Sequence, residues 1–186
     1  IISDGVAKAF EKGSYSGESP SGKDLFTGEV KRERRADIVI GIAGSGKSSV
    51  YSNRISEEHG SRIIDTDDYR DYIPEYNGRN AALVHEEASR IKDEVLGIAL
   101  DRGENVIIST VGGNAEKLAK TILMYKNEGY SVHLHLNHLA NEKAIGRVIS
   151  RYVKKNGEIG RIVLPELVKE MGNSPMLAYL EIIGQG

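Results

Sequence analysis

A short β-branched run, Ile38-Val39-Ile40, leads directly into the pattern Gly41-x-x-x-x-Gly46-Lys47-Ser48, which a helix-compatible stretch follows. A strand, a glycine-rich turn and a helix in this order are typical of the phosphate-binding P-loop. The glycines let backbone N–H groups point inward at the positive end of the next helix, where they bind phosphate oxygens. A plain glycine turn would leave Lys47 without a role, so the pattern predicts binding of a nucleoside triphosphate.

Within this loop, we expect Lys47 to reach the terminal phosphates and Ser48 to hold Mg²⁺. The residues expected to contact the nucleotide are Gly41, Ala43, Gly44, Ser45, Gly46, Lys47, Ser48 and Ser49.

Composition narrows the class of protein further. A chain of 186 residues with 39% hydrophobic residues is suited to one α/β domain. Its net charge of −2 argues against nucleic acid as a partner. It lacks cysteine, which is compatible with a reducing cytoplasm, and no apolar run is long enough to span a membrane. Because the chain begins with Ile1, we expect a part of a longer protein, in which a targeting signal could precede Ile1.

Two regions follow from the distribution of polar residues. Residues 1–35 read as a polar and basic N-terminal extension that ends in the run Lys31-Arg32-Glu33-Arg34-Arg35. We interpret this run as a solvated approach to the first strand, with nucleic-acid contact as the alternative. Residues 36–186 form the predicted P-loop domain.

In this domain, short segments rich in Val and Ile alternate with helix-like segments, which predicts a mostly parallel sheet flanked by helices, with ligands at the carboxyl ends of the strands. The expected strands are 37–41, 61–65, 105–109 and 130–136, and the expected helices are 47–58, 79–102, 114–128, 141–155, 165–171 and 175–182. The long helix carries an apolar stripe of Leu83, Val84, Ala88, Ile91, Val95 and Ala99.

Carboxylates follow the second strand, in the sequence Asp65-Thr66-Asp67-Asp68. A hydroxyl that accepts a phosphoryl group needs a base, and Mg²⁺ needs oxygen ligands, so these residues are candidates for both tasks. If the chain is still extended here, Asp65 and Asp67 face the cleft and Asp68 points elsewhere. An ordinary acidic turn is the alternative.

The third strand ends in Ser109-Thr110, where many P-loop proteins have an acidic residue. Either Asp65 and Asp67 supply the missing negative charge near the metal, or the domain binds Mg²⁺ weakly. Ser109 and Thr110 could contact substrate, or simply cap the strand.

The segment 141–165 carries a basic stripe. Asn141 can cap a helix on which Arg147, Arg151 and Lys155 repeat at helical spacing. Gly157 and Gly160 follow, next to Arg161. Arginines beside a glycine hinge suit a helical lid that brings guanidinium groups to a transferring phosphate, and a solvated helix face is the competing interpretation.

Three histidines, His133, His135 and His138, raise the question of a metal site. No nearby acid or cysteine completes a tetrahedral set, so we expect a polar sheet face here.

Together these blocks resemble the zeta toxins, the P-loop kinases of toxin–antitoxin systems, over residues 36–180. The resemblance implies a P-loop kinase-like α/β fold and a kinase that uses ATP or GTP to phosphorylate a small hydroxyl substrate, in well-known members UDP-N-acetylglucosamine. It also implies a possible antitoxin partner. The blocks are Gly41–Ser48, Asp65–Arg70 with Ile73-Pro74-Glu75-Tyr76 and Ala82–Ala88, and Arg147-x-x-x-Arg151 with Gly160-Arg161-x-Val163-x-Pro165.

Carried over by motif, Lys47 and Ser48 bind phosphates and Mg²⁺, Asp67 is the base, and Arg151 and Arg161 stabilise the transferring phosphate. Many members have an acid followed by Gly-Thr where this chain has Ser109–Gly113, so the sugar substrate is less firmly implied than phosphotransfer. Further candidates are Asp65, Arg70, Ser109, Thr110 and Arg147 for substrate, and Asp65 beside Ser48 for metal.

Two other functions are compatible with the sequence. A polynucleotide 5′-kinase would use the basic run and the arginine stripe, and a nucleotide-dependent switch module would hydrolyse nucleotide slowly without transferring phosphate to an acceptor.

Overall fold

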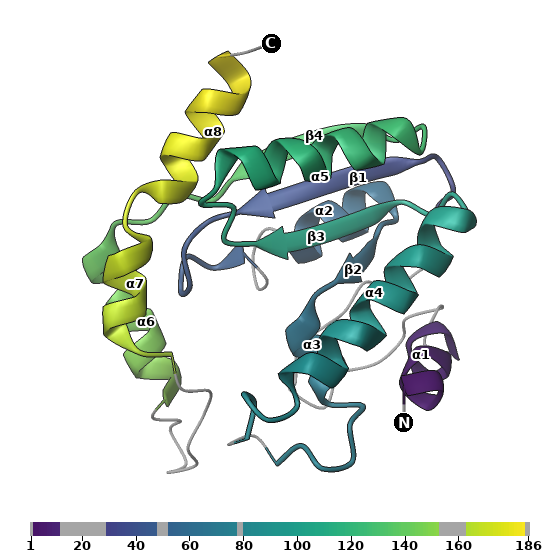
Figure 1. The fold of residues 1–186 in the computed structure, drawn as a ribbon, viewed down its shortest axis with the longest axis horizontal. Helices are drawn as coiled ribbons and strands as arrows, with labels where there is room; N and C mark the ends of the chain where they lie inside the picture. The colour runs from purple at the N-terminus through teal and green to yellow at the C-terminus, as the bar shows by residue number, and fades with distance from the viewer. Residues whose placement is uncertain (1, 12–28, 48–51, 78–79, 153–162, 185–186) are drawn as a thin grey trace.

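A four-stranded parallel sheet forms the centre of the protein in a computed structural model that describes residues 2–11, 29–47, 52–77, 80–152 and 163–184. Its strands are β1 (Arg35–Ile40), β2 (Arg62–Ile64), β3 (Val106–Thr110) and β4 (Ser131–Leu136). They are ordered β2-β3-β1-β4, and Ile38 of β1 pairs with Ile108 of β3 and Leu134 of β4. All the carboxyl ends therefore lie at the same edge of the sheet (Figure 1). The predicted α/β class and parallel sheet are confirmed.

Helices cover both faces of the sheet. On one face, Ile38 and Ile40 belong to a core that includes residues of α4 (His85–Asp101) and α5 (Ala115–Asn127). On the other face, Val39 and Ile107 pack with Ile55 of α2 (Asn53–His59). Because both faces are buried, the central strands are mostly apolar, and the one acidic residue of β1, Asp37, is itself fully buried.

The apolar stripe of α4 is buried as predicted, at Val84, Ala88, Ile91, Val95 and Ala99. Leu83, by contrast, is 83% exposed. The helix begins at His85 and not at residue 79. A turn precedes it, in which the N–H groups of Leu83 and Val84 donate to the Asn80 carbonyl oxygen.

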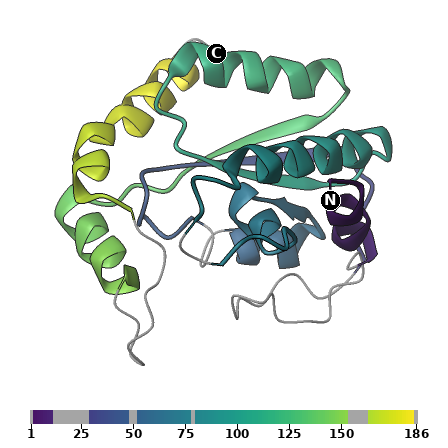
Figure 2. The same cartoon turned by 60° about the horizontal axis from the view of Figure 1, so that its bottom comes forward.

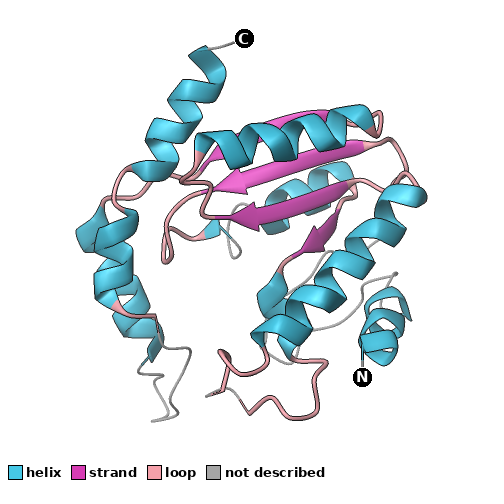
Figure 3. Cartoon of the chain, viewed as in Figure 1, coloured by secondary structure: helices cyan, strands magenta, loops and turns pink. Residues whose placement is uncertain are grey.

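A second apolar cluster joins the P-loop to helices near the C-terminus. Ile42 packs with Ala144 and Val148 of α6 (Asn141–Tyr152) and with Val168 of α7 (Pro165–Met171). Helix α8 (Ser174–Gly184) follows and contacts α5. Figures 2 and 3 show these three helices on the side of the sheet where the strands end.

An N-terminal helix, α1 (Ile2–Glu11), packs on α4, and its Val6 and Ala9 belong to the main core. This helix is not among those predicted from the sequence. The guanidinium groups of Arg62 and Arg102 lie over the Phe10 ring, at 4.5 and 4.4 Å from its centroid. Part of the predicted extension 1–35 is therefore packed against the domain.

None of the helices in the described ranges combines the length and the apolar character that a membrane span needs.

Candidate functional site

The P-loop turns directly after β1, as the sequence predicts. Gly44 and Gly46 have φ values of 79° and 97°, in the left-handed region that favours glycine. Gly44 also touches α6, because a Cβ atom at this position would lie 2.6 Å from the Ala144 carbonyl oxygen. The glycines therefore serve both the shape of the loop and the close approach of α6.

Lys47 folds back over the start of the loop. Its Nζ donates to the carbonyl oxygens of Gly41 and Ile42, at 2.5 and 2.9 Å. This position keeps the ammonium group among backbone atoms that line the loop. Ser48 and Ser49, which the sequence assigns to the same site, lie outside the described residues.

Two side chains from distant segments hold the middle of the P-loop. The Ser45 carbonyl oxygen accepts hydrogen bonds from Arg147 Nη1 at 3.0 Å and from Asn137 Nδ2 at 3.3 Å. Arg147 lies on α6, and Asn137 directly follows β4. Arg147 is among the site residues predicted from the sequence, whereas Asn137 is not, and the one sequence signal for Asn137 is its place at the carboxyl end of a strand.

The backbone after β2 differs from the expectation of an extended chain. Thr66–Arg70 forms a short helix, α3, and the Asp65 side chain caps it by accepting a 3.0 Å hydrogen bond from the Asp67 N–H. The alternation used to place Asp65, Asp67 and Asp68 is therefore wrong. The reason is local, since aspartate is a strong N-cap residue and turns the chain into a helix at this point.

Asp67 contacts a buried arginine. Its Oδ1 lies 2.9 Å from Arg70 Nη1, one helical turn away. The second guanidinium nitrogen, Nη2, lies 3.3 Å from His85 Nδ1 at the start of α4. The described structure thus places Arg70 behind Asp67 and not on the surface.

The hydroxyl of Ser109, at the end of β3, lies 3.1 Å from that of Ser52, which in turn donates to the Lys47 carbonyl oxygen at 3.0 Å. Ser109 therefore connects β3 to the backbone of the phosphate-binding segment. Thr110 is exposed and pairs with Ile40 at the end of β1.

The lid is largely beyond what the structure describes. Arg151 lies in α6, but its side chain is not among the described ones. Arg161, Lys155, Gly157 and Gly160 lie outside the described residues. The roles of these residues and the movement of a lid stay predictions.

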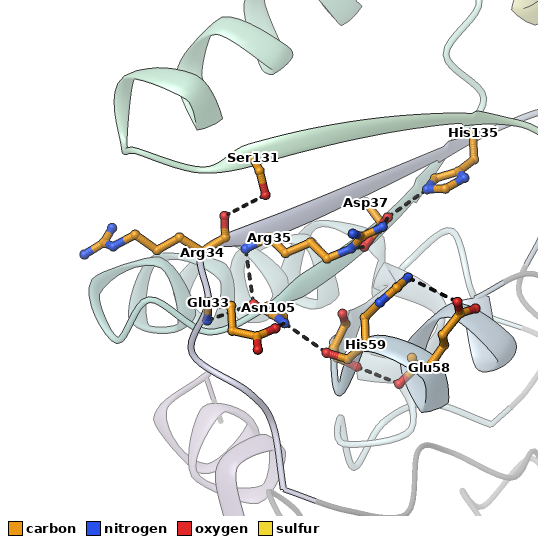
Figure 4. Close-up of polar contacts among 11 residues, drawn as sticks. Glu33, Arg34, Arg35, Asp37, Glu58, His59, Asn105, Ser131 and His135 are labelled. Carbon is orange, nitrogen blue, oxygen red and sulfur yellow. Dashed lines mark hydrogen bonds and ion pairs between the residues drawn. The ribbon is translucent and has the colours of Figure 1, made fainter.

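Away from the P-loop, His135 and Asp37 form a polar cluster on the sheet (Figure 4). Asp37 is fully buried and accepts from His135 Nε2 at 2.7 Å and from Arg35 at 2.8 and 2.9 Å. Burial acts to raise the pKa of Asp37, but the hydrogen bonds from His135 and Arg35 outweigh it and hold the pKa below 3.8. Within the described ranges, no group of three or more His, Cys, Asp or Glu residues is placed to hold a metal ion.

A parallel sheet ordered β2-β3-β1-β4, with a P-loop after β1 and carboxylates after β2, defines an α/β protein of the P-loop kinase type. The chain belongs to the zeta toxin family, whose sequence model matches residues 23–176. Zeta toxins are P-loop kinases, so the family and the fold agree. A comparison with curated proteins finds no match.

Solved structures share the fold. A chain from the PezAT chromosomal toxin–antitoxin system of Streptococcus pneumoniae is 19% identical, with a TM-score of 0.66 over 98% of this chain and 73% of that one. The AvrRxo1-ORF1:-ORF2 complex with ATP gives 16% identity and a TM-score of 0.68, and the complex with sulphate ions gives 15% and 0.68. These two matches cover 99% of this chain but only 57% and 58% of the matched AvrRxo1 chains.

Proposed function

We propose that this protein is a kinase that transfers a phosphoryl group from ATP or GTP to a hydroxyl of a small molecule, with UDP-N-acetyl sugars as the first acceptors to test. The observation that carries the proposal is that three side chains contact one P-loop. Lys47 and Arg147 of α6 donate hydrogen bonds to carbonyl oxygens of the loop, and Ser109 of β3 reaches the Lys47 carbonyl oxygen through the Ser52 hydroxyl. Asp67 lies after β2 at the same edge of the sheet, where an acceptor would meet the terminal phosphate.

Each residue has a role that follows from its chemistry. The backbone N–H groups of the P-loop and the Lys47 ammonium would bind the triphosphate. Asp67, whose side chain is 29% exposed, would accept the proton of the acceptor hydroxyl and orient it for attack. Arg147, Arg151 and Arg161 would stabilise the charge on the transferring phosphoryl group.

Magnesium fits the chemistry of this rim, because its preferred ligands are oxygens and the rim carries the carboxylate of Asp65. Ser48 and Asp65 would hold the ion. When bound, Mg²⁺ neutralises charge on the phosphate oxygens.

An antitoxin partner is part of the proposal, since the structural neighbours come from a toxin–antitoxin system and from a two-component complex. Acceptors other than UDP-N-acetyl sugars must also be tested, because the third strand ends in Ser109 and Thr110 where many relatives have an acidic residue. Loss of a carboxylate from an acceptor pocket changes which hydroxyl compound it selects.

The test is an acceptor screen. The purified protein is incubated with labelled ATP or GTP, Mg²⁺ and hydroxyl compounds that include UDP-N-acetylglucosamine, and products are identified by mass spectrometry. A Lys47→Ala protein is the control. We expect label on a small acceptor only with the unmodified protein. Label found solely as inorganic phosphate would instead indicate a switch module, and label on oligonucleotide 5′ ends a polynucleotide kinase.

A further inference from the structure

Arg70 is the most deeply buried charged group next to the carboxylates of the site, with a side chain that is 8% exposed. We infer that Arg70 is a positioning residue, which holds the Asp67 carboxylate in the orientation needed for proton transfer and makes no contact with the substrate itself. This inference rests on the proposed function, because it assigns a task to the residue beside the proposed base.

The exposed fractions of the two side chains indicate that Arg70 positions Asp67 and does not bind the substrate. The side chain of Asp67 is 29% exposed and can meet an acceptor, whereas the Arg70 guanidinium lies behind it. Arg70 Nη1 lies 2.9 Å from Asp67 Oδ1, at a spacing of three residues on α3. The single Nη1 contact holds one carboxylate oxygen, and the planar guanidinium sets its direction because Nη2 of the same group contacts His85. A flexible lysine has one ammonium group and cannot keep both contacts in this fixed geometry.

The other end of the guanidinium is attached to the scaffold. Arg70 Nη2 lies 3.3 Å from His85 Nδ1. Since a guanidinium only donates hydrogen bonds, His85 must accept through an unprotonated Nδ1, which leaves the proton on Nε2. His85 is the first residue of α4, a helix of 17 residues packed on the core. Arg70 therefore connects Asp67 to a rigid element.

Such a connection is needed because α3 has only five residues and cannot be rigid by itself. Its Tyr69 and the nearby Ile73 and Val84 are buried in the main core, so the backbone is anchored. The carboxylate of Asp67 projects from this anchored turn, and Arg70 fixes its direction.

A cost accompanies the arrangement. Arg70 Nε is buried and has no hydrogen-bond partner in the described part of the chain. An unsatisfied buried donor destabilises the fold, and apolar residues often replace buried ion pairs without loss. A purely structural role would favour such a replacement. The presence of the buried Arg70 guanidinium is explained if its role is to orient the Asp67 carboxylate.

The experiment is a double-mutant cycle in kinetics. Asp67→Asn, Arg70→Met and the double variant are compared with the unmodified protein for kcat, for the KM of the acceptor and for nucleotide affinity. Arg90→Met is the matched control, since Arg90 is an exposed arginine on α4. Arg70→Lys serves if Arg70→Met does not fold, and His85→Ala tests the link to α4.

We expect Arg70→Met to lower kcat about 10²-fold with nucleotide affinity nearly unchanged, and Arg70→Lys to restore only part of the rate. We expect His85→Ala to cause a smaller loss of the same kind. In the Asp67→Asn background, Arg70→Met should have no further effect, because its target is gone.

Three results would overturn the inference. They are an unchanged kcat in folded Arg70→Met, a loss confined to the KM of the acceptor, and losses that multiply in the double variant. An unmodified protein that transfers phosphate to no acceptor would instead overturn the proposed function, and the inference with it.

Discussion

The guanidinium of Arg147 donates a 3.0 Å hydrogen bond to the carbonyl oxygen of Ser45, across 102 positions of sequence. Helix α6 is therefore attached to the centre of the P-loop. Because this contact places a cation at the proposed phosphate site, we predict that Arg147→Ala lowers kcat/KM by about 10²-fold. Steady-state kinetics measure this, and Lys143→Ala, an exposed cation on the same helix, is the control. Equal rates for the two variants would show that the contact only supports the loop.

Arg151 and Arg161 are predicted to act in the transition state. Arg151→Ala and Arg161→Ala should each lower kcat about 10²-fold or more, with a smaller change in nucleotide affinity. Lysine should rescue poorly, because a point charge does not reproduce a guanidinium fork. Wild-type rates in both alanine variants, or full activity with lysine at both positions, would leave a solvated helix face as the explanation.

Lys47→Ala should reduce turnover by orders of magnitude and leave the fold intact. Its ammonium donates to the loop carbonyls of Gly41 and Ile42, at the edge of the sheet where the triphosphate is proposed to bind, so the substitution should remove a phosphate ligand. Phosphotransfer assays and a thermal melt measure the two effects. A folded Lys47→Ala protein with unchanged turnover is incompatible with the assigned site.

Asp67→Asn should abolish most transfer and largely spare nucleotide binding, whereas Asp68→Asn should be mild. The reason is the helical backbone of α3, which turns Asp68 by about 100° from Asp67 and so away from the Arg70 contact. Kinetics and nucleotide titration of both variants decide this. If Asp68→Asn proves more damaging at equal stability, Asp67 is not the base.

Asp37 should make stability depend on pH in acid. Its pKa in the folded protein is below 3.8, so its stabilising contribution is present above that value and is lost as the pH falls through the folded pKa. Urea unfolding of the unmodified protein and of Asp37→Asn measures it. We expect the variant to be less stable near neutral pH by about 2 kcal/mol, the range for a hydrogen bond to a charged group, and the difference to narrow below pH 3.8. A difference that stays constant with pH would contradict the prediction.

Phe10→Ala should lower the free energy of unfolding by about 2 kcal/mol, since it removes a ring that the guanidinium groups of Arg62 and Arg102 both contact. Urea denaturation measures the change, and Lys8→Ala, an exposed position on the same helix, is the control. Equal stability of the two variants would mean that α1 does not dock in solution.

Local patterns were sufficient for much of the fold and for one part of the site. The β-branched run before Gly41 and the Lys47 motif predicted a strand, a phosphate loop and a family, because these depend on residues adjacent in the chain. The apolar stripe from Val84 to Ala99 predicted the buried face of α4 for the same reason.

Other elements could not be predicted, because they depend on a local capping hydrogen bond or on contacts between segments far apart in the sequence. Helix α3 replaced an expected extended segment because Asp65 caps it, and α1 is recognisable mainly through its packing on α4. The sequence alone thus determined which residues form the strands and the phosphate loop. The contacts of Asn137 and Arg147 with Ser45, and the link from Asp67 through Arg70 to His85, follow from the folding of distant segments onto one another. Pattern periodicity carries no information about which side chains meet once the chain has folded back on itself.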